Sequence, residues 1–350
     1  MKRIIGSAVG LFCVLALVGC GGDGNSAPTQ KEPSSGGKTA TEWVKELKDT
    51  NKHIRQAAAE NLGLIGPPAK LVASGPLLAA LKDADETVKV KAAQALVKID
   101  KDCRDQIPTL VEALKGTNIE AKILAAETVA AIGPPAKDAV PALIDSLKDY
   151  NKELSKKSSD ALEAIGKDAI PALADALRTK NEQLRAPAIE ILKKLGPQVI
   201  PAITEVIKER DADTREAGAK VLVDMKAAAV PAFVAALEDY DKATRLFGAK
   251  QLGEMGPGAK EAVPALVKKL KDNETIVRTE VINTLVKVGK DAVAAVALAV
   301  KDPEEYVRVF AAEVLVKIGA DAVPALTELS NDSNEAVKKL AQDSLKKIKK

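Results

Sequence analysis

Histidine, cysteine and aromatic residues, which many enzyme active sites use, are scarce in this sequence. The chain has 350 residues, of which one is histidine, three are cysteine and 2% are aromatic. A single histidine, His53, cannot build a multi-histidine metal site, and Cys103 is the only cysteine outside the N-terminal segment. We interpret His53 as a surface residue and Cys103 as a tolerated thiol in a turn before a helix. No glycine-rich phosphate loop follows an expected strand. The sequence therefore predicts no catalytic residue, no metal, no cofactor and no enzyme.

The chain also lacks a strong net charge. It has 52 basic and 49 acidic residues, and Lys2 and Arg3 lie in a segment that we expect to be removed. The remaining 50 basic and 49 acidic residues give a net charge of +1. A nucleic-acid-binding surface would favour a basic stripe. The composition therefore predicts no nucleic-acid partner, although a local basic patch stays open.

The first residues predict export and attachment to lipid. A basic start at residues 1–3 precedes an apolar run, residues 4–18, which suits a signal peptide and is short for a transmembrane helix. The run ends in Leu17-Val18-Gly19-Cys20. This ending resembles the lipobox of bacterial lipoproteins, which implies removal of residues 1–19 and lipidation of Cys20. Ordinary cleavage or an uncleaved anchor is the alternative.

Residues 20–40 are rich in glycine, serine and proline and contain almost no large apolar side chain. Such a composition predicts a flexible tether, with a root-mean-square span of roughly 25 Å. The lipoprotein resemblance favours the outer membrane or periplasm over the inner membrane, because Gly21 and not aspartate follows Cys20. We therefore expect a protein lipid-anchored in the bacterial cell envelope, facing outside the cytoplasm.

The rest of the chain, residues 41–350, repeats one unit of two short helices. In residues 255–289 two apolar stripes of helical spacing flank the expected turn Lys271-Asp272-Asn273. A period of roughly 30 residues is typical of solenoids, in which each hairpin buries its faces against its neighbours. The apolar residues that we expect to end the second helices are Ile65, Ile99, Ile132, Ile165, Leu195, Met225, Met255, Val288, Ile318 and Ile348.

A proline, an acid and a base recur within the unit. The proline opens or bends the first helix of most repeats, at Pro76, Pro108, Pro141, Pro171, Pro201, Pro231, Pro264 and Pro324. The acids are Asp49, Asp83, Asp149, Glu209, Asp239, Asp272, Asp302 and Asp332. The bases, six residues later, are Arg55, Lys89, Lys122, Arg185, Arg215, Arg245, Arg278, Arg308 and Lys338.

This pattern resembles the HEAT repeat, and its shorter form is similar to the variant named from phycobilin lyases. The resemblance implies an all-α fold, a right-handed α-α superhelix (α-solenoid) of about ten HEAT-like helical hairpins. It also implies that acids and bases form a structural ladder within or between neighbouring repeats. We further interpret Asp83, Asp302 and Asp332 as N-caps of second helices. Because Gly116, Ser155 and Thr179 replace ladder acids or bases, we hypothesise a weaker joint between about residues 107 and 185, to which Pro187 adds.

A HEAT array implies a scaffold or an adaptor, and occasionally an enzyme. The position two residues after each base varies between repeats, and Phe247 and Phe310 occupy it in two of them. We interpret both as possible partner-binding anchors, with the filling of inter-repeat gaps as the alternative. The predicted function is a non-catalytic protein–protein interaction scaffold or adaptor tethered to an envelope membrane. A lyase-like or enzyme-accessory protein that handles a chromophore or another ligand is the alternative.

Overall fold

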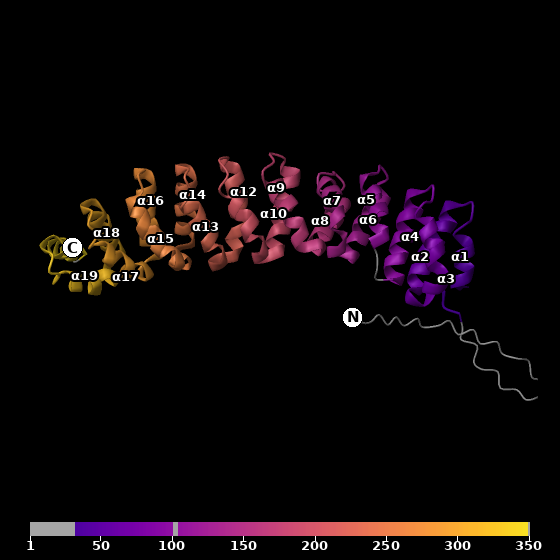
Figure 1. Cartoon of the computed structure of the whole chain (residues 1–350), viewed down its shortest axis with the longest axis horizontal. Coiled ribbons are helices and arrows are strands. Elements are labelled where there is room, and N and C mark those ends of the chain that lie inside the picture. The colour runs from indigo at the N-terminus through magenta and orange to yellow at the C-terminus, as the bar shows by residue number, and fades with distance from the viewer. Residues whose placement is uncertain (1–31, 101–103, 349–350) are drawn as a thin grey trace, which may run out of the picture.

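The computed structural model describes residues 32–100 and 104–348. The predicted signal peptide, the lipidation site Cys20 and Cys103 lie outside the described residues. Within them, twenty α-helices alternate with short turns, and Figure 1 shows the resulting hairpins standing side by side in one gently curved row. The odd-numbered helix is the first and the even-numbered helix the second of each hairpin. The predicted all-α solenoid of about ten hairpins is confirmed.

The element bounds repeat with the period of the sequence. The first helices are α1 (Ala40–Glu46), α3 (Lys70–Ala80), α5 (Ile107–Lys115), α7 (Val140–Ser146), α9 (Ile170–Leu177), α11 (Ile200–Val206), α13 (Val230–Leu237), α15 (Val263–Lys268), α17 (Lys290–Ala299) and α19 (Val323–Leu329). The second helices are α2 (Lys52–Ile65), α4 (Glu86–Ile99), α6 (Ile119–Ile132), α8 (Lys152–Ile165), α10 (Glu182–Leu195), α12 (Ala212–Leu222), α14 (Lys242–Met255), α16 (Thr275–Val288), α18 (Glu305–Ile318) and α20 (Glu335–Ile348). Short 3₁₀ segments are Pro67–Ala69, Arg104–Gln106, Pro134–Ala139, Gly166–Ala169, Gly196–Val199, Val223–Ala229, Gly256–Ala262, Lys269–Lys271 and Gly319–Ala322.

Most of the recurring prolines lie in the first turn of a first helix, as predicted. Proline suits this position because the first turn leaves its amide hydrogens unpaired in any case. Pro76 differs, since it lies inside α3. Ala294 replaces the proline in α17, which starts directly after Gly289 without a 3₁₀ segment. The first-turn prolines belong to α5, α7, α9, α11, α13, α15 and α19.

The interpretation of the ladder acids as N-caps was wrong by two residues. The cap of α4 is Asp85, and the cap of α18 is Glu304. The carboxylate of Asp83 accepts a hydrogen bond from the backbone N–H of Asp85 at 2.8 Å, and Asp302 accepts one from Glu304 at 3.0 Å. Asp332 does the same for Asn334. Each acid therefore closes the turn before the second helix, as Asp and Asn side chains commonly do, and does not cap the helix itself.

The structure describes the last part of the segment that we expect to be a tether. Residues 32–39 are ordered as a small antiparallel hairpin of β1 (Ser34–Ser35) and β2 (Lys38–Thr39). Gly36 and Gly37 both have positive φ angles, which a two-residue turn between such strands requires. The buried Trp43 donates from Nε1 to the Ser35 carbonyl oxygen at 2.8 Å. The hairpin thus covers the first end of the array, and α1 begins at residue 40.

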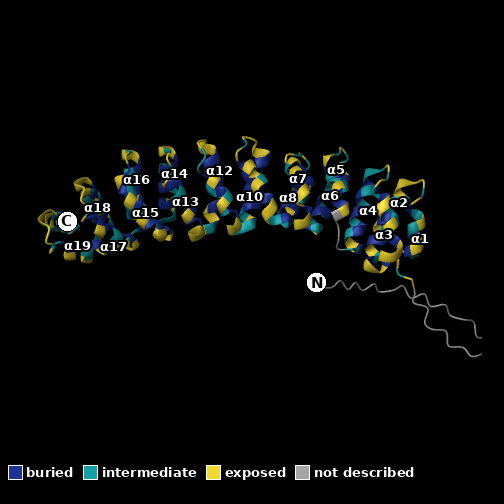
Figure 2. Cartoon of the chain, viewed as in Figure 1, coloured by how far each residue is buried: buried dark blue, intermediate teal, exposed yellow. Residues whose placement is uncertain are grey.

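The apolar core lies between the packed helices along the whole row (Figure 2). One buried cluster extends from Val90 to Ala341, and a second joins α1, α2, α3 and part of α4. The core is continuous through residues 107–185, where we hypothesised a weaker joint, and α10 runs unbroken past Pro187. Its division lies earlier, in α4, whose residues contribute to both clusters.

No single helix among the described residues is long and apolar enough to cross a bilayer. The helix α2 together with residues 67–80 passes a test of length and composition only as a pair bent by 112°. Both halves of this pair contribute buried residues to the core, among them Leu62 and Leu77.

Candidate interaction edge and ion-pair ladder

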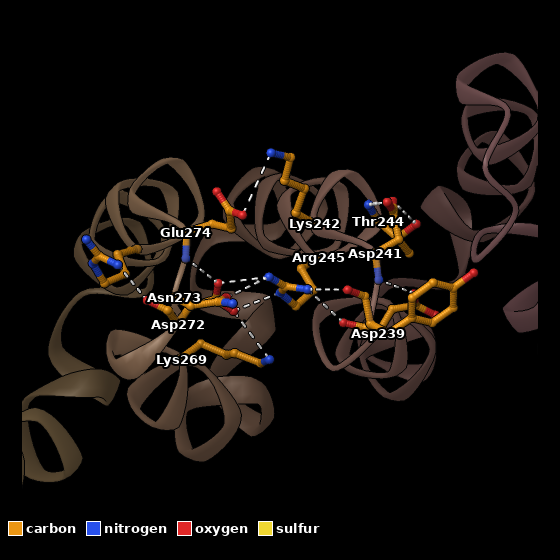
Figure 3. Close-up of polar contacts among 11 residues, drawn as sticks. Asp239, Asp241, Lys242, Thr244, Arg245, Lys269, Asp272, Asn273 and Glu274 are labelled. Carbon is orange, nitrogen blue, oxygen red and sulfur yellow. Dashed lines mark hydrogen bonds and ion pairs between the residues drawn. The ribbon is translucent and has the colours of Figure 1, made fainter.

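The ladder arginines hold the turns between the first and second helices. In five repeats the Nη1 group of the arginine donates to one or two backbone carbonyls of its own turn. Arg245, for example, bonds the carbonyl oxygens of Asp239 at 3.2 Å and Tyr240 at 2.7 Å (Figure 3). The arginine side chain thus hydrogen-bonds to backbone carbonyl groups just after the first helix, which have no hydrogen-bond partner within the helix. The same contact is made by Arg55, Arg215, Arg278 and Arg308.

Two ladder arginines also form bidentate ion pairs with the acid of the next repeat. Arg245 donates from Nε and Nη2 to the carboxylate of Asp272 at 2.8 and 3.0 Å, and Asn273 adds a further acceptor (Figure 3). Arg55 contacts Asp83 in the same way at 2.7 and 2.8 Å. Such planar geometry is specific to the guanidinium group. The ladder therefore links neighbouring repeats, whereas the base and acid of one repeat meet through backbone atoms.

Lys122 likewise pairs with Asp149 of the next repeat, at 3.4 Å, but several other predicted ladder residues have different partners. Asp49 and Asp239 each accept a backbone N–H of their own turn. Asp302 pairs with Lys271 at 3.0 Å and Asp332 with Lys301 at 2.8 Å, so lysines replace the arginines there. Lys338 pairs with Glu335 of its own helix. Lys89 forms no ion pair with any residue that the structure describes, because Gly116 stands where the next acid would be.

The ion pairs set the charge state of the aspartates. Burial raises the pKa of Asp272, but the hydrogen bonds from Arg245 and from the Glu274 amide outweigh it, so the pKa lies below its usual value. The pKa of Asp83 is lowered in the same way against the effect of burial. The Lys301 ammonium group and the Asn334 amide lower the pKa of Asp332. These aspartates are therefore ionised at neutral pH and take part in structure.

Phe247 and Phe310 lie half-buried in the gaps between repeats. The Cζ atom of Arg215 is 5.7 Å from the centre of the Phe247 ring, and that of Arg278 is 5.8 Å from the Phe310 ring. Each arginine belongs to the preceding repeat, so the rings carry cation–π contacts along the array. Their position fits the filling of gaps that we weighed as the alternative. A role as partner anchors stays a prediction.

The tyrosines form a feature that we did not derive from the sequence. Tyr150 and Tyr240 lie in the turns that lead into α8 and α14, and Tyr306 lies in the first turn of α18; they are exposed by 87%, 78% and 44%. Figure 1 shows the hairpins in one row, so the turns and the helix starts that follow them form one edge of the array, which we call the turn edge. Tyr306 also meets the Phe310 ring edge-to-face at 6.0 Å. Tyr150 and Tyr240 share one register, one residue after the acid, and this was the signal in the sequence.

Comparison with known proteins agrees with the repeat geometry. The family model for HEAT repeats matches residues 40–118, 107–193 and 230–300. The chain belongs to the HEAT repeat family. Its later repeats also match the PBS lyase HEAT-like repeat over residues 307–332. No protein of curated function matches this HEAT-repeat chain.

Several solved structures share the solenoid arrangement at low sequence identity. A structure of Kap95p with RanGDP is 14% identical, with a TM-score of 0.42, and the match covers 88% of this chain and 51% of that chain. Kap121p bound to RanGTP is 14% identical, with a TM-score of 0.45, and the match covers 88% of this chain and 41% of that chain. The HEAT-repeat chain thus spans about half, or less, of the length of these proteins.

One further surface of the HEAT array bears on function. The outer side of α3 exposes Leu71 by 99% together with Val72 and Leu78, in a stretch, residues 61–82, that contains no Asp or Glu. That lack of acids was visible in the sequence, and we missed it. No group of three or more His, Cys, Asp or Glu side chains among the described residues is placed to hold a metal ion.

Proposed function

We propose that this HEAT-repeat protein is a non-catalytic scaffold or adaptor that binds a protein partner along its turn edge. The observation that carries the proposal is the placement of all three tyrosines, exposed, at this edge of a chain that has few aromatic residues. Tyrosine is enriched in protein interfaces, because its ring buries a large apolar area while its hydroxyl group makes a hydrogen bond.

The ladder supports this proposal because it makes the edge rigid. The Arg245 guanidinium donates to the backbone carbonyl of Tyr240, and Arg210 donates to the Tyr240 hydroxyl oxygen at 3.2 Å. A side chain that is ordered before binding loses less conformational entropy when the partner arrives.

The anchoring part of the proposal rests on the sequence. A signal-like N-terminus that ends in Gly19-Cys20 supports attachment to an envelope membrane through lipid on Cys20, with the array outside the cytoplasm. The apolar outer side of α3 lies in the second hairpin, beside α1, where the described chain begins. It would therefore be close to the membrane that holds the tether.

The test is crosslinking in the native cell followed by affinity purification. The wild-type chain is compared with Tyr150→Ser/Tyr240→Ser/Tyr306→Ser, and with the control Val223→Ser, which removes an exposed apolar side chain next to the inter-repeat turn after α12. We expect one reproducible protein partner that is lost from the triple variant and kept in the control. Recovery of the protein alone, or an unchanged partner in the triple variant, would contradict the proposal.

The anchor is tested separately by cell fractionation. The Cys20→Ala variant should move from the membrane fraction to the soluble envelope fraction. A variant that stays with the membrane would rule out anchoring by lipid on Cys20.

A second candidate function has one observation in its favour. The match of residues 307–332 to the PBS lyase HEAT-like repeat supports a protein that handles a chromophore or another ligand. A coloured or small-molecule component that copurifies with the chain in stoichiometric amount would favour this function over the scaffold.

A further inference from the structure

The ladder arginine of the fifth repeat, Arg185, lacks the contacts that its counterparts make. Arg185 is only 8% exposed, yet its Nε and Nη2 groups have no hydrogen-bond partner. Its one charged contact is with Glu182 of the same helix, at 3.3 Å. A buried guanidinium with unpaired donors is costly. The residues around Arg185 show why its usual partners are missing.

The acidic partner that Arg185 would use is taken by another residue. Arg55 and Arg245 pair with the carboxylate of the next repeat's acid. The acid that follows Arg185, Glu209, accepts from Arg178 at 2.9 Å instead.

Arg185 also lacks the aromatic ring that covers the ladder arginines Arg215 and Arg278. Phe247 and Phe310 each lie two residues after the base of their own repeat and cover the arginine of the preceding one. In the repeat that follows Arg185, the same position is Ala217. A methyl group thus stands where two other repeats place a phenyl ring.

A pocket lies between α10 and α12. It has a volume of about 260 Å³, and its lining includes Arg185, Ile189 and Ala217. Small-molecule sites measure roughly 300–1,000 Å³, so this pocket better fits one side chain than a cofactor. Three acidic and three basic residues line it, which gives no preference for a charged ligand.

We infer that this pocket, which we call the Arg185 pocket, binds an aromatic side chain of a protein partner. The inference rests on the proposed scaffold function and names one anchor of that partner. The incoming ring takes the place that Phe247 occupies beside Arg215, with its face against the guanidinium group of Arg185. Stacking on a desolvated arginine is favourable for aromatic rings, and a ring enclosed in this way is typical of interface hot spots.

The test uses p-cresol, which has the side chain of tyrosine, and the chain of residues 21–350, which includes every described residue. Alanine methyl groups are labelled and followed by NMR during titration. We expect a saturable shift of the Ala217 methyl signal, with a dissociation constant on the order of 1 mM for so small a ligand. The saturated analogue 4-methylcyclohexanol should bind several-fold more weakly, because it cannot make a cation–π contact.

Two variants make the test specific. Ala217→Phe should fill the pocket with its own side chain and abolish p-cresol binding. If that variant does not fold, Ala217→Leu is used instead, because its side chain also fills the pocket but carries no ring. Phe247→Ala should open a matching pocket beside Arg215 and gain a second binding site. No shift in the wild type, equal binding to the filled variants, or equal binding of the saturated analogue would each overturn the inference. The test needs no protein partner, so a failure here would not contradict the proposed scaffold function, which the crosslinking experiment tests separately.

Discussion

At the scale of single residues, the pair of Arg245 and Asp272 shows what the ladder contributes to stability. The Asp272 side chain is only 2% exposed and receives both the Nε and the Nη2 group of Arg245. We expect Asp272→Ala to lower the free energy of unfolding by about 3 kcal/mol, because it leaves a buried guanidinium without its counter-ion. Urea denaturation followed by circular dichroism measures this difference. Glu335→Ala, which removes an exposed partner of Lys338, serves as the control and should leave the midpoint unchanged.

The Arg245–Asp272 pair also predicts how the stability difference between wild type and Asp272→Ala depends on pH. The pKa of Asp272 is lower in the folded chain than the value near 3.9 of an unfolded aspartate. The unfolded chain therefore binds more protons, and the stabilisation is complete above about pH 4 and is lost as the pH falls through the lower folded pKa. The gap between wild type and Asp272→Ala should narrow below pH 4. A gap that stays constant from pH 7 to pH 3 would show that the ion pair is not its cause.

The sequence could predict which residues belong to the ladder but not which residue each of them contacts. Spacing identified Arg245 and Asp272, because a regular repeat brings the same positions together in every hairpin. Whether a ladder arginine contacts a carboxylate or an aromatic ring depends on the repeat that follows it. Asp272 follows Arg245 and pairs with it, whereas Phe247 follows Arg215 and covers it. Such choices follow from side-chain rotamers and local competition, which periodicity does not contain. The lysine pairs of Asp302 and Asp332 were unforeseen for the same reason.

At the scale of elements, the turn after α12 departs from the others. In seven other repeats a glycine with a positive φ angle follows the second helix, which glycine adopts without strain. The sixth repeat has Lys226 there, with φ of 48° and ψ of −129°. The helix before it ends at Leu222, three residues short of the predicted end at Met225. The glycines are Gly66, Gly133, Gly166, Gly196, Gly256, Gly289 and Gly319.

Replacing this lysine with glycine should therefore stabilise the chain. A side chain held in such a sparsely populated conformation costs on the order of 1–3 kcal/mol. We expect Lys226→Gly to raise the free energy of unfolding by about 1 kcal/mol, since the flexible glycine also costs entropy on folding. Differential scanning calorimetry measures the shift in melting temperature. The control Lys167→Gly, in a turn where Gly166 already supplies the positive φ, should lower the melting temperature or leave it unchanged.

Helix positions were predictable from the sequence because the apolar stripe and the turn signals agree in nearly every repeat. Nine of the ten predicted ends of second helices coincide with the observed ends. The exceptions are places where one local interaction overrides the repeat. The turn glycines Gly36 and Gly37 and the buried Trp43 order a hairpin that composition alone assigned to the tether. The missing glycine at Lys226 coincides with the early end of α12.

At the scale of the whole molecule, the buried clusters of the described residues divide within α4, and Gln106 is a buried polar residue in the adjoining joint between the second and third hairpins. This residue precedes α5 and is buried, and its Oε1 atom has no hydrogen-bond partner among the described residues. In the other repeats with a first-turn proline, the same position holds a buried alanine or valine, as in Ala139 and Val199. An unpaired polar atom in place of an apolar contact weakens the joint. The pattern of ladder exceptions instead places the weaker joint between about residues 107 and 185, and this stays a prediction.

Gln106→Ala should therefore join the two clusters and stabilise the array. Removing a buried, unsatisfied carbonyl oxygen is worth roughly 1–3 kcal/mol, less the packing that the glutamine side chain itself provides. Hydrogen exchange in the wild type should be fast in α4 and α5 compared with α14 and α16, and the variant should slow it there by about tenfold or more, since each 1.4 kcal/mol changes an opening constant tenfold. Gln198→Ala, an exposed glutamine in the corresponding turn before α11, should change nothing. Exchange that is fastest throughout residues 107–185 would instead favour the joint inferred from Gly116, Ser155 and Thr179.

A flexible joint at Gln106 has a consequence for the proposed function. The proposed lipid anchor precedes α1 to α4, whereas the later hairpins carry all three tyrosines. Bending at Gln106 would therefore let the proposed partner-binding edge change its orientation relative to the proposed anchor.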